Sequence, residues 1–341
     1  HNAHIMIRYL TVVMAAVAIM AGAQDRITVC YDDGDPVVGA AVFDNQERVL
    51  ETTDCNGVFT APDANLFPLH IKALGLIDTY IQAPTATVRM AASPVALSEI
   101  VVDNDKRPIL KLTCLLKETS GFTTTTDTMS IKGEYMVEFY LPMKKVKKFK
   151  AIKEPLVRSE RVAYRNTVKD QQDMDKDMLS FKDVVSLKYK PFNEKESLKA
   201  KASGTDTTFA KKTGRPERIF RKSPHDYTMR IDQLANEKNG IMSPNVLKIF
   251  GLTMDFTQLL ATYQYEPSDS GIHSISDMTG MTLSFEVTGK GKLIKKFLNT
   301  KDDVDIYGYL ELIPLDREFL TVEDAKEQSK ASYKLPFPEN K

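Results

Sequence analysis

The sequence has little cysteine and no net charge, and each of these shortages excludes a class of protein. Its 341 residues contain three cysteines, Cys30, Cys55 and Cys114, which are too few to frame a fold with disulfide bonds. Lys and Arg together number 46, as do Asp and Glu, so the formal net charge is zero. A balanced chain offers no electrostatic reason to bind nucleic acid or an acidic membrane surface. We therefore expect neither a disulfide scaffold nor a nucleic-acid-binding protein.

The short motifs that identify common enzymes are also missing. The sequence has no G-x-S-x-G nucleophile segment, no P-loop, no dinucleotide fingerprint and no C-x-x-C pair. The histidines beyond residue 23 are His70, His225 and His273, which are too scattered to predict a metal site. No cysteine has a histidine nearby in sequence to act as its base. We therefore predict a non-catalytic protein with no catalytic, cofactor-binding or metal-binding residues.

The N-terminal segment has the pattern of a secretory signal peptide. Arg8 is followed by an apolar run at 9–20 and then by the small residues Ala21-Gly22-Ala23. The run is too short to span a membrane, which takes about 20 apolar residues. We expect residues 1–23 to comprise upstream residues and a signal peptide. The protein is then exported, to the periplasm or to the outer-membrane-associated cell envelope.

From Asp25 to Asp103 short apolar runs alternate with turn residues, as in an all-β domain. The dipeptide Asn56-Gly57 is typical of a tight hairpin, because both central positions of its turn need positive φ. The alternation places His70 opposite Leu69 and Ile71, so we expect this histidine to face solvent. The expected strands lie at 27–31, 38–43, 47–53, 58–60, 69–73, 79–82 and 87–90. About seven strands at this spacing predict a β-sandwich. Cys30 and Cys55 both lie in this domain, and a disulfide between them is left open.

Four motifs of this region resemble those of the carboxypeptidase regulatory-like family. Segment 34–42 (GDPVVGAAV) is similar to the family's G-x-P-L-x-G-A-x-V opening, and segment 53–59 (TDCNGVF) to its T-D-x-x-G-x-F motif. Leu74-Gly75 matches a family glycine, and 97–102 (LSEIVV) resembles the closing L-x-E-V-V-V. The usual Gly-x-Val entry is replaced by residues 29–31. The resemblance implies a transthyretin-like β-sandwich at 25–103, without catalytic residues, in a Bacteroidota-type exported protein.

Residues 104–341 are predicted to form a β-rich α+β domain of unknown function. Alternating runs at 109–118, 131–141, 281–287 and 304–312 indicate a sheet with one buried face and one face in water. Cys114 lies on the apolar side of the first run, where a buried thiol is expected. Polar residues at 193–218 predict a long, mobile loop and those at 119–130 a shorter one. A glycine-containing turn at 289–291 favours a further strand at 292–297.

Helix signals in this second region are fewer. Apolar residues at 174–185 have helical spacing, and Ser243-Pro244 is a typical helix start. Thr321 followed by Asp324 resembles a capping box at the start of a final helix. The fold class predicted for the whole chain is therefore mainly β, with a seven-stranded type of sandwich followed by a β-rich α+β domain.

Three stretches carry residues that invite a functional interpretation. Asp173, Asp175 and Asp177 have calcium-loop spacing but lack the loop's glycine and its final Glu, which favours a solvated helix face. Asp269-Ser270-Gly271 matches an aspartic-protease triplet by letters, although its flanks favour a turn. Five lysines lie within 144–150 and either contact an anionic lipid or polysaccharide or protect a strand edge or loop.

Charge differs between the two predicted domains. Residues 25–103 hold 12 acidic and 4 basic residues, a net charge of −8, whereas residues 104–341 hold 34 acidic and 41 basic residues, a net charge of +7. We predict a non-catalytic cell-envelope protein that binds another envelope protein or a polysaccharide, with association to a membrane left open and no integral span. The alternatives are a small outer-membrane β-barrel or transporter-associated component, which long charged loops disfavour, and a hydrolase with its site in 104–341.

Overall fold

The structure is a computed structural model that describes residues 26–93, 106–125, 128–166, 182–187, 205–225, 227–244, 253–266, 273–297 and 300–339. The chain divides into two compact units, His1–Ser93 and Pro94–Lys341, called unit 1 and unit 2 below. The expected signal peptide at 1–23 and the closing motif at 97–102 lie outside the described residues. So do the aspartates at 173–177, the triplet at 269–271 and most of the helices expected at 174–185 and after Ser243.

Unit 1 is a β-sandwich, as the spacing of its apolar runs predicts. Its described strands are β1 (Arg26–Tyr31), β2 (Ala41–Phe43), β3 (Val49–Thr52), β4 (Val58–Thr60), β5 (Leu69–Lys72), β6 (Thr79–Ile81) and β7 (Thr87–Met90), with a short 3-10 helix η1 (Ala64–Leu66) before β5. They form a three-stranded sheet in the order β4-β1-β7 and a four-stranded sheet in the order β3-β2-β5-β6. β1 pairs with β7 in parallel, and the other pairs are antiparallel.

The turn at Asn56-Gly57 forms, but it does not close the hairpin that was expected there. β3 pairs with β2, and β4 pairs with β1, so the turn carries the chain from one sheet to the other. The Asp54 carboxylate accepts hydrogen bonds from the backbone N–H groups of Asn56 (2.8 Å) and Val58 (2.9 Å). Gly57 has a φ of 70°, which a glycine adopts without strain. Local chemistry therefore sets the turn, and packing between the sheets sets what it joins.

One core lies between the two sheets of unit 1. Its fully buried members come from both sheets: Ile27, Val29, Val37, Ala40, Val42, Phe59, Leu69, Ile71, Ala73, Val88 and Met90. Cys30 is buried beside this core and its thiol contacts the carbonyl of Val88 at 3.7 Å. No disulfide joins Cys30 to Cys55 among the described residues. The sandwich is therefore held by apolar burial, with no covalent cross-link.

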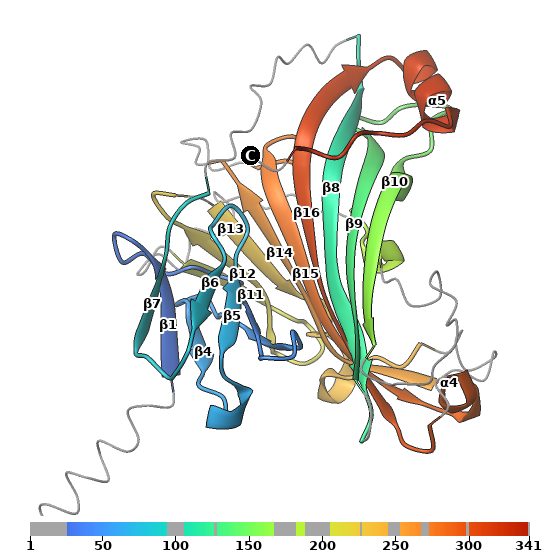
Figure 1. The fold of residues 1–341 in the computed structure, drawn as a ribbon. Coiled ribbons are helices and arrows are strands. Elements are labelled where there is room, and N and C mark those ends of the chain that lie inside the picture. Colours follow the sequence, from blue (N-terminus) through green and yellow to red (C-terminus); the bar gives the residue numbers. More distant parts are fainter. Residues whose placement is uncertain are drawn as a thin grey trace, which may run out of the picture. The chain divides into compact units, whose positions relative to one another are not determined.

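Unit 2 is built on one antiparallel sheet with the strand order β10-β9-β8-β16-β15-β14-β13-β12-β11. Figure 1 shows that its long central strands form a curved sheet, with the helix α5 at one end. The strands are β8 (Ile109–Thr123), β9 (Thr128–Pro142), β10 (Ile152–Asn166), β11 (Thr205–Phe209), β12 (Pro216–Lys222), β13 (Tyr227–Asp232), β14 (Thr253–Tyr265), β15 (Met278–Lys290) and β16 (Val304–Leu320). The described helices are η3 (Lys182–Val184), η4 (Lys238–Gly240), α4 (Lys292–Phe297) and α5 (Val322–Lys330). The prediction of a mainly β protein is confirmed.

Three local predictions for unit 2 are wrong. Most of the predicted loop at 119–130 is strand, because β8 continues to Thr123 and β9 begins at Thr128, and β-branched threonines suit strands. The predicted loop at 193–218 contains β11 and the start of β12, which form a hairpin at one edge of the sheet. Of this hairpin's residues only Ala210 and Phe220 are buried, so its sequence has no alternating apolar pattern from which strands could be predicted. Residues 292–297 form α4 instead of a strand, and residues 193–204 lie outside the description.

The apolar face of the large sheet carries the main core of unit 2. Leu110, Leu112, Cys114 and Leu116 on β8 join Tyr135, Val137, Phe139 and Leu141 on β9 and apolar residues of β12 to β16. Cys114 is fully buried as predicted, and burial raises the pKa of its thiol. The opposite face is not left in water: Met136 and Glu138 of β9 are also buried there. That expectation failed because elements distant in sequence cover this second face.

α5 begins at the capping signal that the sequence predicts. The Thr321 hydroxyl accepts a hydrogen bond from the Asp324 backbone N–H at 3.1 Å and donates one to the Asp324 carboxylate at 2.7 Å. Val322 and Ala325 then pack on the sheet, and residues 331–339 continue as a segment without regular secondary structure. Among the described residues, no helix has the length and apolar composition needed to cross a membrane.

Candidate functional site

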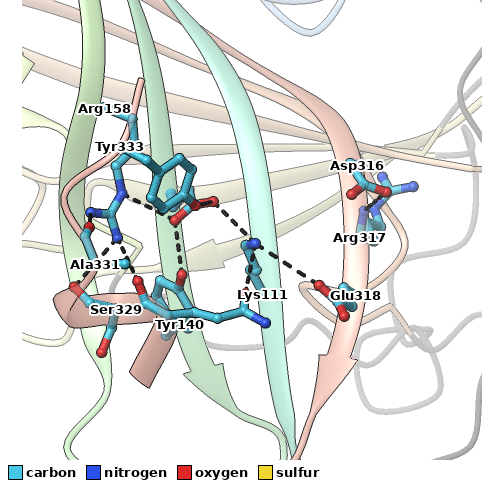
Figure 2. A network of polar contacts seen from close by, with 11 residues as sticks. Lys111, Tyr140, Arg158, Asp316, Arg317, Glu318, Ser329, Ala331 and Tyr333 are labelled. Carbon is cyan, nitrogen blue, oxygen red and sulfur yellow. Dashed lines mark hydrogen bonds and ion pairs between the residues drawn. The ribbon is translucent and has the colours of Figure 1, made fainter. Parts of the chain in front are cut away.

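The densest group of buried charges in the described chain lies where α5 meets the large sheet. Adjacent strands supply its members: Lys111 from β8, Glu138 and Tyr140 from β9, and Arg158 from β10. Tyr333 reaches it from the segment after α5, and Figure 2 shows its ring over the group. Because residues two apart in a strand face the same side, β9 places Glu138 and Tyr140 together.

Glu138 is the centre of this group, and its side chain is fully buried. The carboxylate accepts hydrogen bonds from the hydroxyls of Tyr140, at 2.8 Å, and Tyr333. Lys111 Nζ lies 3.2 Å from one carboxylate oxygen and Arg158 Nε lies 3.2 Å from the other. Four donors from the chain itself therefore satisfy this carboxylate (Figure 2).

Burial and the four donors have opposite effects on the pKa of Glu138. Burial by itself raises the pKa of a carboxyl group, because desolvation disfavours the charged form. The hydrogen bonds from Tyr333 and Tyr140 and the charge of Lys111 outweigh burial, and the pKa of Glu138 is lowered. Burial and the bond to Glu138 raise the pKa of Tyr333 to about 12. At neutral pH the carboxylate is charged and both tyrosines keep their protons.

Arg158 links the buried carboxylate to the end of α5. Its guanidinium donates to the backbone carbonyls of Gln328 (3.1 Å), Ser329 (3.3 Å) and Ala331. Gln328 and Ser329 lie in the last turn of α5 and Ala331 follows its end, and the Gln328 carbonyl also accepts a hydrogen bond from the Ala331 backbone N–H at 3.1 Å. A cation there also interacts favourably with the helix dipole. Arg158 thus caps α5 from a neighbouring strand and holds it to the sheet.

A lysine-rich loop lies beside this group, between the end of β9 and the start of β10. Its apolar residues Val146 and Phe149 pack on a small core made of Ile109, Tyr140, Leu320 and Ala325. Lys144, Lys145, Lys147, Lys148 and Lys150 are all exposed. In the described part of the chain, Lys145, Lys147, Lys148 and Lys150 form no ion pair. We call residues 144–150 the lysine loop.

The backbone of the lysine loop is held in an unfavourable conformation. Lys148 has a φ of 66°, in the left-handed region. For a residue with a Cβ this conformation costs on the order of 1 kcal/mol. Tyr140 connects the loop to the buried charges, because it belongs to the small core on which Val146 and Phe149 pack and its hydroxyl donates to Glu138. The four lysines without ion pairs are therefore presented on an anchored loop.

Among the described residues of unit 2, His273 has an aspartate and a serine close by, as a hydrolase site would. His273 Nδ1 lies 2.9 Å from the Asp277 carboxylate, and Ser274 donates to the same carboxylate at 3.0 Å. A serine nucleophile must instead contact the histidine nitrogen that faces away from the carboxylate. His273 is fully buried against the rings of Tyr227 and Tyr265. These contacts make a turn before β15, and they do not assemble a catalytic triad.

His70 in unit 1 is buried, contrary to the expectation that it faces solvent. It lies opposite Leu69 and Ile71 as predicted, but its ring stacks on Tyr80 at 4.3 Å and its nitrogens contact Asp78 (3.0 Å) and Glu47 (3.3 Å). Burial lowers the pKa of His70, but Asp78 and Glu47 together raise it by more. The net effect is a pKa above the ordinary value for histidine. The described residues contain no group of His, Cys, Asp and Glu that could hold a metal ion.

Sequence patterns give no signal for Glu138, Arg158 or Tyr333. In the sequence Glu138 is one of several polar residues on the side of an alternating strand that was predicted to face water, and Tyr333 lies 195 residues away from it. Their contact depends on the docking of the chain's last segment. The lysine loop, in contrast, is visible as a run of lysines, and the structure adds its anchoring residues.

Comparisons with known proteins add little. No family model matches the chain, and no curated protein matches it. Among solved structures, the chain is similar to one in a structure titled "Lipid-protein interactions in lipovitellin", with 9% sequence identity and a TM-score of 0.24. The match covers 63% of this chain and 26% of that chain, so it spans about a quarter of the other protein's length.

Proposed function

We propose that this protein is a non-catalytic cell-envelope protein that binds an anionic polysaccharide through the lysine loop. The observation that carries the proposal is the set of four exposed lysines without ion pairs, held within six residues on an anchored loop. Fixed cations attract a polymer of regularly spaced negative charges, and they lose little conformational freedom of the backbone on binding. The loop belongs to the region with a net charge of +7.

The buried carboxylate of Glu138 has its donors within the chain. Glu138 is saturated by Tyr140, Tyr333, Lys111 and Arg158 and is closed to solvent. Unit 1 contributes a sandwich whose conspicuous residues make turns and core, in keeping with the proposed carboxypeptidase regulatory-like domain. The proposal of export rests on the signal-peptide pattern at 1–23. It is tested by isolating the protein from the cell-envelope fraction and measuring its mass, which should lack these residues.

The binding proposal is tested with a polyuronate such as alginate as the probe and neutral dextran as its uncharged counterpart. In the full chain, Lys145, Lys147, Lys148 and Lys150 are changed together to Gln. We expect affinity for the polyuronate to fall by at least about tenfold, since each lysine at an anionic surface contributes about 1 kcal/mol. Raising the salt concentration weakens wild-type binding, because exposed charges are screened.

A matched control removes the same number of charges elsewhere. Lys211, Lys212, Lys238 and Lys292 are exposed lysines of unit 2 outside the lysine loop, and changing all four to Gln alters net charge equally. We expect this variant to bind the polyuronate with an affinity within about twofold of wild type. That change is well below tenfold, which corresponds to about 1.4 kcal/mol of binding free energy. Equal losses in the two variants would show that net charge alone matters. Equally tight binding of duplex DNA would contradict the choice of polysaccharide.

A further inference from the structure

The last described segment of the chain lies along β9 and β10 and contacts their side chains. We call residues 331–337 the strap and the face of β8, β9 and β10 beneath it the strap groove. Tyr333 donates to Glu138, the Ser159 hydroxyl donates to the Leu335 carbonyl at 2.6 Å, and the Arg161 guanidinium lies 3.6 Å from the centre of the Phe337 ring. These contacts follow an alternation in which Tyr333, Leu335 and Phe337 are half-buried.

The strap is held by side chains of the groove, and no backbone ladder joins it to the described strands. Ser332, Lys334 and Pro336 are exposed between the half-buried residues. Pro336 and Pro338 favour an extended chain before binding, which lowers the entropy lost when the strap docks. Such a segment leaves and enters its groove without any change in the pairing of the sheet.

Departure of the strap removes partners from two charged groups in the groove. Glu138 loses the Tyr333 hydroxyl, and Arg158 loses the Ala331 carbonyl and the ring of Tyr333, which lies 4.6 Å from its guanidinium. Glu138 then keeps three of its four donors, and Arg158 keeps the Gln328 and Ser329 carbonyls and the Glu138 carboxylate. The vacated groove therefore has one donor position and one acceptor position to fill, which a segment of the same chemistry satisfies.

We propose that the strap groove is an interface between copies of this chain, in which the strap of one copy occupies the groove of another. The segment that demonstrably fits is the chain's own, with Tyr333, Leu335 and Phe337 in register with Glu138, Ser159 and Arg161. In cis the strap has an effective concentration on the order of millimolar, so the single chain is closed by default. Residues 332–337 reach about 20 Å when extended, so exchange requires two copies to approach at their α5 ends.

Complementation between two full-length variants tests this. In the first, Tyr333→Ala and Phe337→Ala remove the anchors of the strap and leave the groove intact. In the second, Ser159→Glu and Arg161→Glu place carboxylates against the Leu335 carbonyl and the Phe337 ring and leave the strap intact. We expect each variant alone to be monomeric in native mass spectrometry. An equimolar mixture forms a one-to-one heterodimer, because the intact strap of the second enters the intact groove of the first.

A second measurement keeps the test decisive if the groove variant does not fold. A fluorescent peptide of residues 331–339 is titrated into the full-length strap variant, whose folding is checked by circular dichroism. We expect saturable binding, at least tenfold weaker binding of a peptide that carries Tyr333→Ala and Phe337→Ala, and no binding to wild type at low peptide concentration. Absence of peptide binding, or two folded variants that stay monomeric when mixed, would overturn the proposal. Neither result depends on the lysine loop, so the two proposals fail independently.

Discussion

Glu138 shows why a charge is tolerated inside this protein. A buried carboxylate without partners is neutralised or destabilises the fold, because desolvation disfavours the ionised form. Here Lys111 and Arg158 balance the charge, and two tyrosine hydroxyls fill the remaining acceptor positions. The group also joins β8, β9, β10 and the strap. The carboxylate therefore contributes to where the chain's end docks as much as to local stability.

Replacing Glu138 by Gln is expected to be strongly destabilising at neutral pH. Removing one partner of a buried ion pair costs about 3–5 kcal/mol, because the remaining cations lose their counter-charge. Glu160→Gln, an exposed change on the same sheet edge, is expected to cost less than about 0.5 kcal/mol. Urea denaturation of both variants measures these differences, and equal costs would contradict the assignment.

The cost of Glu138→Gln has a definite pH dependence. The folded-state pKa of Glu138 is lowered, so its contribution to stability is present above the pKa of the unfolded chain. That contribution is lost as the pH falls through the folded pKa. The stabilities of wild type and variant are therefore expected to converge in acid. A gap that widened in acid would show that the carboxylate is not the stabilising form.

At the scale of elements, turns illustrate how local sequence and packing divide their roles. Gly34 and Gly57 both have positive φ, at 94° and 70°. A Cβ at Gly34 meets no atom within 4 Å, whereas a Cβ at Gly57 meets the Val29 carbonyl at 2.4 Å and the Pro36 side chain at 2.9 Å. Gly34 is needed for its backbone conformation alone. Gly57 is needed for that and also because β1 passes close to the turn.

This difference predicts unequal effects of the same substitution. Gly34→Ala is expected to cost about 1–2 kcal/mol, the cost of a left-handed residue with a Cβ. Gly57→Ala adds the cost of overpacking, about 1–3 kcal/mol, because a backbone carbonyl cannot move aside as a flexible side chain does. Denaturation curves of the two variants provide the comparison. Equal destabilisation would indicate that the sheets separate freely at this turn.

At the largest scale, each of the two units has apolar cores of its own among the described residues. The core of unit 1 is built from residues between Ile27 and Met90, and those of unit 2 from residues between Ile109 and Ala325. Each unit buries its own apolar side chains and thus has the means to unfold as its own cooperative transition. The opposite net charges of the two regions are a property of their surfaces and do not define the cores.

Calorimetry of single variants tests this division. We expect two transitions in the wild-type chain, with Gly57→Ala lowering the midpoint of one and Glu138→Gln lowering the midpoint of the other. The destabilised core determines which transition moves, since each substitution lies in a different unit. A single transition shifted by both variants would show that the units unfold together.

The sequence by itself determined the strands of unit 1 and, in unit 2, parts of β8, β9, β15 and β16, because period-2 alternation records which side chains one face of a sheet buries. It did not indicate β10, β13 or β14. The burial of Cys114 and the helix cap at Thr321 were also predictable, because burial in a strand and capping of a helix both depend on residues that are close in sequence. Polar strand segments were not predicted: Thr123 pairs with Thr128, and β11 with β12, through backbone groups that leave no apolar pattern.

Only the tertiary structure decided which elements meet. The sequence contains the Asn56-Gly57 turn but not the sheet change that it makes, which depends on pairing between distant strands. It contains Glu138, Arg158 and Tyr333 as ordinary polar residues, and their network exists because the strap returns across β9 and β10. Local rules act over a few residues, whereas such contacts are selected by the free energy of burying charge and apolar surface together.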